Sequence, residues 1–138
     1  MRDLRSKQEI SVAASKTQIE AERREMDRFV VHEDNLEWVP ADFPRAQMKV
    51  LYMDPRGGGQ ILLVHFEPYC EMPAHTHISS DEAAYVLEGE LRQQGEGDEE
   101  EVYRVGHFAF FPVGAEHGPF TTGEEGCTII SVFYGPLG

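Results

Sequence analysis

Apolar residues along this chain gather in short runs separated by glycine, proline and charged residues, a pattern typical of strands rather than helices. Residues 47–54 form the first clear run, and Pro55 with the glycines at 57–59 ends it. Residues 60–66 are apolar at almost every position, so we expect a strand buried on both faces. The short gap between these two runs predicts a tight hairpin.

The second half of the chain continues this alternation of strands and turns. Four further strands are predicted, at residues 83–87, 90–94, 102–111 and 127–134. The first two would pair around Gly89. In the third, period-two alternation places Phe108 and Phe110 on one face and Ala109 and Phe111 on the other. Repeated short strands with glycine and proline turns, and no good helix after residue 29, predict an all-β barrel or sandwich.

Residues 1–28 differ in character from the rest of the chain. They are charged and alanine-rich, and they contain neither glycine nor proline. Their apolar residues, from Leu4 to Met26, do not form a continuous stripe on a helix. We therefore expect an N-terminal arm, either disordered or a marginal helix that needs a partner chain to cover it. Residues 29–138 would form a single domain.

Composition excludes several classes of partner. The net charge of −13 disfavours a nucleic-acid partner and an anionic membrane surface, because phosphate groups recruit Lys and Arg. No apolar run reaches the roughly 18 residues of a membrane-spanning helix, and the N-terminal residues lack the apolar core of a signal peptide. Cys70 and Cys127 are the only cysteines, and we expect free thiols in a reducing cytoplasm. The sequence gives no support for a disulfide between them.

Two polar features are expected to be structural rather than chemical. The run at 95–101 holds five carboxylates in seven residues, but it lacks the regular spacers of a calcium loop. We interpret it as a solvated hairpin tip. His65 lies inside the apolar run at 60–66, where it either supports a functional site from behind or is a core histidine with a backbone partner. We favour the core histidine.

Candidate chemistry gathers at two places in the chain. His75 and His77 are two residues apart, so both imidazoles point to the same side if the segment is a strand. Glu82 follows closely enough to return to the same point, and a second strand would bring in His117. Three imidazoles and a carboxylate suit Fe, Mn, Ni, Co or Zn better than Ca or Mg. These four residues are candidate ligands of one divalent metal ion per chain, and Glu82 is also the candidate catalytic residue.

The same residues stand in motifs that resemble those of the cupin family. The first family motif, HxH followed by Glu and then Gly, matches His75, His77, Glu82 and Gly89 without a spacing error. The second, a glycine followed by Pro-x-Gly and a histidine, matches GHFAFFPVGAEH at 106–117. The short gap between the two motifs is similar to that of single-domain microbial cupins.

The resemblance covers roughly residues 36–136 and implies a jelly-roll β-barrel, also called a double-stranded β-helix. Two positions depart from the family pattern, since Tyr69 stands where a glycine is expected and Thr121 where an asparagine is expected. Neither position binds metal in the family, so the departures affect only local turn geometry. Cupins commonly pair through their sheets, and exposed strand edges need cover, so we expect a homodimer.

The segments LEWVP at 36–40 and VFYGPL at 132–137 resemble cupins that cleave β-diketones with dioxygen. This resemblance implies a dioxygenase, or a related lyase, acting on a small dicarbonyl or hydroxyaryl ketone. Fe(II) is the favoured ion, with Zn, Mn, Ni or Co as alternatives. Such relatives use three histidines and do not always bind the metal through their glutamate, so Glu82 is the least certain ligand.

Two other functions stay open. LEWVP also resembles the cupin domain of zinc-dependent anti-sigma factors, which implies a non-catalytic sensor that binds a metal or a small ligand. Residues 1–31 contain no histidine or cysteine, whereas that family carries further zinc ligands in an N-terminal domain, and this disfavours the sensor. A metal-dependent isomerase or cyclase without redox chemistry would use the same residues as the dioxygenase.

Overall fold

The computed structural model describes residues 28–95, 97 and 99–135, and these confirm the predicted all-β class. The arm predicted at 1–28 lies outside them except for its last residue. A short 3₁₀ turn, η1 (Glu33–Asn35), precedes the strands. These are β1 (Val39–Pro40), β2 (Ala46–Met53), β3 (Gln60–Phe66), β4 (Glu71–Met72), β5 (Glu82–Gln94), β6 (Glu100–Arg104), β7 (Phe108–Phe111) and β8 (Phe120–Phe133). The described residues include no helix with the length and apolar character needed to cross a bilayer.

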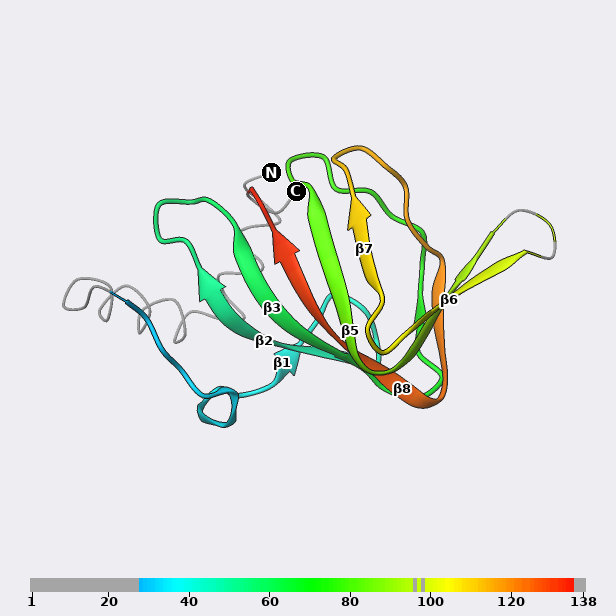
Figure 1. Cartoon of the computed structure of the whole chain (residues 1–138), viewed down its shortest axis with the longest axis horizontal. Helices are drawn as coiled ribbons and strands as arrows, with labels where there is room; N and C mark the ends of the chain where they lie inside the picture. Colours follow the sequence, from blue (N-terminus) through cyan, green and yellow to red (C-terminus); the bar gives the residue numbers. More distant parts are fainter. Residues whose placement is uncertain (1–27, 96, 98, 136–138) are drawn as a thin grey trace.

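The strands form one antiparallel sheet that folds back on itself (Figure 1). Its order is β1-β2-β3-β8-β5-β6, with β4 paired to β8 and β7 paired to β5. The two longest strands, β5 and β8, run side by side through both layers. The later half of β8 pairs with β3 and the early half of β5, whereas its early half pairs with β4 and the later half of β5. The result is the predicted jelly roll.

The hairpin predicted around Gly89 is wrong, because residues 83–94 belong to the single strand β5. Both halves of β5 pair with β8, and the register between these strands shifts at Gly89. Gly89 has φ +69°, and Gly126, next to its partner Cys127, has φ +68°. A glycine in this left-handed conformation suits a bulge as well as a hairpin tip, and pairing with β8 selects the bulge. The strand bends there instead of reversing.

The strand predicted at 102–111 is divided in two. β6 ends at Arg104, and a turn at Gly106 (φ +92°) separates it from β7. The main-chain N–H of Gly106 donates to the carbonyl oxygen of Val86 at 3.0 Å, so the turn is fixed to β5. Within β7 the predicted faces are correct, since Phe108 and Phe110 are exposed while Ala109 and Phe111 line the interior. The last strand, β8, begins seven residues before the predicted position 127.

The hairpin of β2 and β3 is confirmed, and the described residues of the run 95–101 lie at the turn of a hairpin between β5 and β6. β2 and β3 pair from Ala46–Phe66 to Met53–Gln60, and no residue of β3 is exposed. At 95–101, the N–H of Gly95 donates to the carbonyl oxygen of Glu99 at 2.8 Å, which closes the turn between β5 and β6.

His65 is not the core histidine that we favoured, because it is half-buried on the outer side of the sheet, away from the interior. Its neighbours on the strand, Val64 and Phe66, point into the interior. Because adjacent side chains on a strand point to opposite faces, the ring of His65 lies on the other side of the sheet. Nδ1 of His65 lies 2.9 Å from Oγ1 of Thr128, and its ring centroid lies 6.0 Å from that of Trp38. The partner is a side chain rather than the expected backbone group.

The core follows the inward-facing positions of the sheet. One cluster surrounds Phe66, Phe120 and Ile129, and a second surrounds Met48 and Phe133. Both cysteines are buried free thiols, as expected. The outer face of β5 and β7 exposes a set of large apolar residues, Tyr85, Leu87, Phe108 and Phe110. The homodimer stays a prediction.

Gly89→Ala should destabilise the protein strongly, because the added Cβ would lie 2.1 Å from the carbonyl oxygen of Gly126. Gly97→Ala is the matched control, since Gly97 has a similar φ of +65° and nothing lies within 4 Å of the added Cβ. We expect Gly97→Ala to lower the free energy of unfolding by about 1 kcal/mol and Gly89→Ala by at least about 3 kcal/mol. Urea denaturation measures both. Equal losses would contradict a close strand approach at Gly89.

Candidate metal centre

The two predicted motifs meet through a short backbone bridge. The N–H of His75 donates to the carbonyl oxygen of His117 at 2.9 Å, and the N–H of His117 donates back to that of His75 at 2.9 Å. The N–H of Gly114 donates to the carbonyl oxygen of His77 at 2.8 Å. The strand expected at 75–77 is reduced to an isolated bridge, because the partner segment turns at Gly114 and Gly118, both with positive φ.

The three histidine side chains converge on one point. One ring nitrogen from each of His75, His77 and His117 lies within 4.8 Å of the other two. Nδ1 of His75 lies 3.0 Å from the carbonyl oxygen of Pro73, which can only accept, so Nδ1 carries the proton. The lone pair of Nε2 is thereby left free for an ion, which is the usual way in which a hydrogen bond selects the tautomer of a ligating histidine.

His117 is the most buried of the three, with 3% of its surface exposed. Its ring centroid lies 4.4 Å from that of Phe111, and neither ring nitrogen has a hydrogen-bond partner among the described residues. Burial, helped by the nearby charge of His75, lowers the pKa of His117 to about 4, so its ring is neutral near pH 7. A buried polar group without a partner costs free energy. A metal ion would supply that partner, so these residues fit one.

Glu82 completes the donor set from the first position of β5. Its Oε1 lies 3.4 Å from Nε2 of His77 and 3.5 Å from Nε2 of His117. Adjacent ligand atoms around an ion with bonds of 2.0–2.2 Å are separated by about 3 to 3.5 Å. Burial alone would raise the pKa of Glu82, but hydrogen bonds from His77 and Ser131 and the charges of both histidines lower it overall. An ionised carboxylate therefore faces the same point as the imidazoles.

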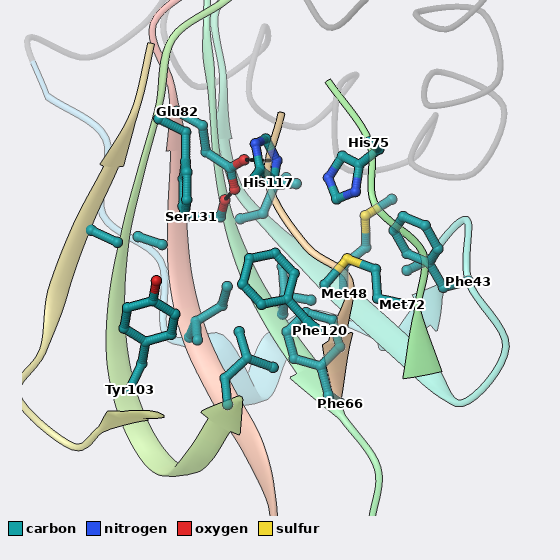
Figure 2. A pocket seen from close by; sticks show the side chains of 18 of the residues that line it. Phe43, Met48, Phe66, Met72, His75, Glu82, Tyr103, His117, Phe120 and Ser131 are labelled. Carbon is teal, nitrogen blue, oxygen red and sulfur yellow. Dashed lines mark hydrogen bonds and ion pairs between the residues drawn. The ribbon is translucent and has the colours of Figure 1, made fainter. Parts of the chain in front are cut away.

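A cavity of about 170 Å³ adjoins these groups inside the barrel. In Figure 2 the polar side chains His75, His117 and Glu82 lie at one end of the cavity. The ring of Phe120 lies next to them, with its centroid 6.2 Å from that of His117, and Phe66 lies further away. The remaining lining is mostly apolar and comes from every long strand of the sheet. This lining includes Phe, Tyr and Met side chains, which suit a small organic molecule.

The structure brings together all four residues predicted to bind metal, His75, His77, Glu82 and His117. Sequence reasoning missed Ser131, whose hydroxyl donates to Oε2 of Glu82. A signal for it exists, because period two places Ser131 on the same face as two apolar neighbours in the run 127–134. A lone hydroxyl on an otherwise apolar inward face needs a partner.

Comparison with known families gives one match. A family model described as "ChrR Cupin-like domain" matches residues 26–137. No curated protein sequence matches the chain.

Several solved structures share this architecture. KdgF from Halomonas sp. is 22% identical with a TM-score of 0.65, covering 78% of this chain and 94% of that one. The polyketide cyclase RemF from Streptomyces resistomycificus is 23% identical with a TM-score of 0.69, covering 80% and 81%. A putative acetylacetone dioxygenase from Methylibium petroleiphilum PM1 is 19% identical with a TM-score of 0.66, covering 81% and 80%. These similarities show the fold alone.

Replacing His75, His77 or His117 by Ala should lower metal affinity more than about tenfold, because each change removes one of few donors. Glu82→Gln should weaken binding less, because it removes the charge of one donor and leaves all three imidazoles in place. His65→Ala is the matched control, because this histidine lies on the other face of the sheet. Metal content after dialysis measures the effect. Retention of one ion per chain by two of the three site variants would refute the assignment.

The metal-free protein should lose stability on acidification. The pKa of His117 is lowered from 6.5 to about 4, so between these values the unfolded chain binds more protons than the folded one. Stability present above pH 6.5 is therefore lost as pH falls toward 4, by roughly 3 kcal/mol. Glu82, with its pKa lowered from 4.5, adds a loss in the same direction below pH 4.5. His117→Gln should flatten the curve between pH 6.5 and 4; parallel curves for both proteins would contradict this account.

Proposed function

The chain belongs to the ChrR cupin-like family, and from this premise we propose that it is a metal-dependent enzyme that cleaves a small dicarbonyl compound with dioxygen, or by a related lyase reaction. The observation that carries the proposal is the position of the donor set. Three imidazoles and a carboxylate face one point at the polar end of an apolar cavity. An ion held there would contact any molecule that enters the cavity.

The donor set favours a particular group of ions. Mixed imidazole and carboxylate ligands suit Fe(II), and they also accept Zn, Mn, Ni or Co. We favour Fe(II), because a bound redox-active ion would supply the activation of dioxygen that this reaction needs. Four protein donors also leave positions free on a six-coordinate ion, and a dicarbonyl can occupy two of them with its two oxygens.

The cavity favours a small and uncharged ligand. Its volume of about 170 Å³ is close to the roughly 150 Å³ of an engineered cavity that holds benzene. Among the described residues, no Lys or Arg lines it, and its two acidic residues are Asp42 and Glu82. A charged group in the apolar end would be buried without a partner, at a cost of several kcal/mol. Small neutral β-dicarbonyls therefore fit better than bulky hydroxyaryl ketones.

The side chains of the apolar end have a positioning role in this proposal. Phe66 and Phe120 are buried at 4% and 3% exposure, so they form a closely packed apolar wall of the cavity beside the donor set. A small ligand between this wall and the ion would be held in one orientation, which lowers the entropic part of a reaction barrier.

Two alternatives follow from other observations. The similarity to a structure described as a polyketide cyclase supports a non-redox cyclase or isomerase at the same site. The family description supports a sensor that binds a metal and a small ligand without turning it over. All three functions share the donor set, so only the reaction distinguishes them.

The iron-loaded protein should consume dioxygen when given 2,4-pentanedione, and much less without it. An oxygen electrode measures the uptake. Zinc has no redox chemistry, so the zinc-loaded protein should bind the same compound and remain inactive. His117→Ala should abolish uptake, whereas His65→Ala should leave it unchanged.

The other outcomes select the alternatives. Stabilisation by dicarbonyl ligands without oxygen uptake in the iron form would identify a binding module. Equal conversion of a carbonyl substrate by the zinc and iron forms, without dioxygen, would identify a non-redox isomerase, cyclase or lyase.

A further inference from the structure

Ser131 is a buried hydroxyl in direct contact with the proposed metal centre. It lies in β8 with 2% of its surface exposed, and it lines the same cavity as the donor set. Its cross-strand neighbours Ala84 and Leu62 are apolar, so neither side chain competes for the hydroxyl. The single hydrogen-bonding partner recorded for Ser131 Oγ among the described residues is Oε2 of Glu82.

The two oxygens of Glu82 therefore have different surroundings. Oε2 accepts the hydrogen bond from Ser131, whereas Oε1 lies 3.4 Å from Nε2 of His77 and 3.5 Å from Nε2 of His117. Figure 2 shows the carboxylate between Ser131 on one side and His117 on the other. The hydroxyl thus fixes which oxygen faces the point where the histidine nitrogens converge.

We propose that Ser131 is a positioning residue that makes Glu82 bind a metal ion through one oxygen only. This inference rests on the proposed function and deepens it. A carboxylate can take one or two positions on an ion. With three imidazoles and one carboxylate oxygen, a six-coordinate ion keeps two positions free, the number a chelating dicarbonyl needs. Binding through both oxygens of Glu82 would leave one.

The test uses the full-length protein loaded with Mn(II), under nitrogen. Relaxation of solvent protons by bound Mn(II) reports the number of exchangeable water molecules on the ion. In Ser131→Ala the freed carboxylate can bind through both oxygens, so we expect this relaxation to fall by about half for a six-coordinate ion. Titration with 2,4-pentanedione, which displaces these waters, should show an affinity at least about tenfold weaker than in the native protein.

Thr128→Val is the matched control. Thr128 is a buried hydroxyl on the same strand, and its Oγ1 contacts His65 on the opposite face of the sheet. The Thr128→Val variant should leave the solvent-proton relaxation and the affinity for 2,4-pentanedione unchanged, although it removes a comparable hydrogen bond. In a Glu82→Ala background, Ser131→Ala should have no further effect, because the group that it positions is absent.

The proposal would be overturned if Ser131→Ala kept the native solvent-proton relaxation and the native affinity for 2,4-pentanedione. An effect of equal size in the Glu82→Ala background, or an equal effect of Thr128→Val, would also overturn it. If Ser131→Ala does not fold, Ser131→Cys keeps a group of similar size with a weak donor, and it should change both quantities in the same direction. The relaxation measurement involves neither dioxygen nor turnover. A protein without oxygen uptake would therefore fail as a dioxygenase and could still show the Ser131 effect.

Discussion

The pairing of β5 with β8 along almost their whole length is the constraint on which the rest of this structure depends. Both strands bend where Gly89 lies against Cys127 and Gly126, and the added Cβ of either glycine would meet a carbonyl oxygen. Because the two strands bend together, their inward faces enclose one cavity instead of lying flat. The early half of β5 and the late half of β8 then place Glu82 and Ser131 on the same wall, close enough for a hydrogen bond.

Burial of the polar groups at one end of this cavity lowers the stability of the metal-free protein. A carboxylate and a neutral imidazole are buried beside Phe111, and both nitrogens of His117 lack hydrogen-bond partners within the described part of the chain. Folding has to stabilise this arrangement against desolvation, and among the described residues Ser131 and the neighbouring histidines compensate for part of that cost. An ion would neutralise the carboxylate and bind the ring nitrogens, so the same groups that weaken the metal-free protein would strengthen the loaded one.

The sequence predicted which polar side chains meet better than it predicted where the strands bend and end. The two motifs that contain His75, His77, Glu82 and His117 were sufficient to predict that these four side chains converge on one point. The bend at Gly89 was not predictable, since one left-handed glycine suits a hairpin tip or a bulge, and only the partner strand decides between them. Ser131 was missed for the same reason, because its contact depends on the register between distant strands.

The size of the cavity has a separate origin from its chemistry. Ala84 and Ala109 are direct cross-strand partners on β5 and β7, and both face the cavity. Larger side chains at this pair would reduce the volume of the cavity, although neither residue belongs to the donor set. The donor set consists of motif residues, whereas the volume of the cavity depends on inward positions at which the motifs specify no residue. A shared cupin fold therefore fixes where chemistry happens more firmly than which molecule enters.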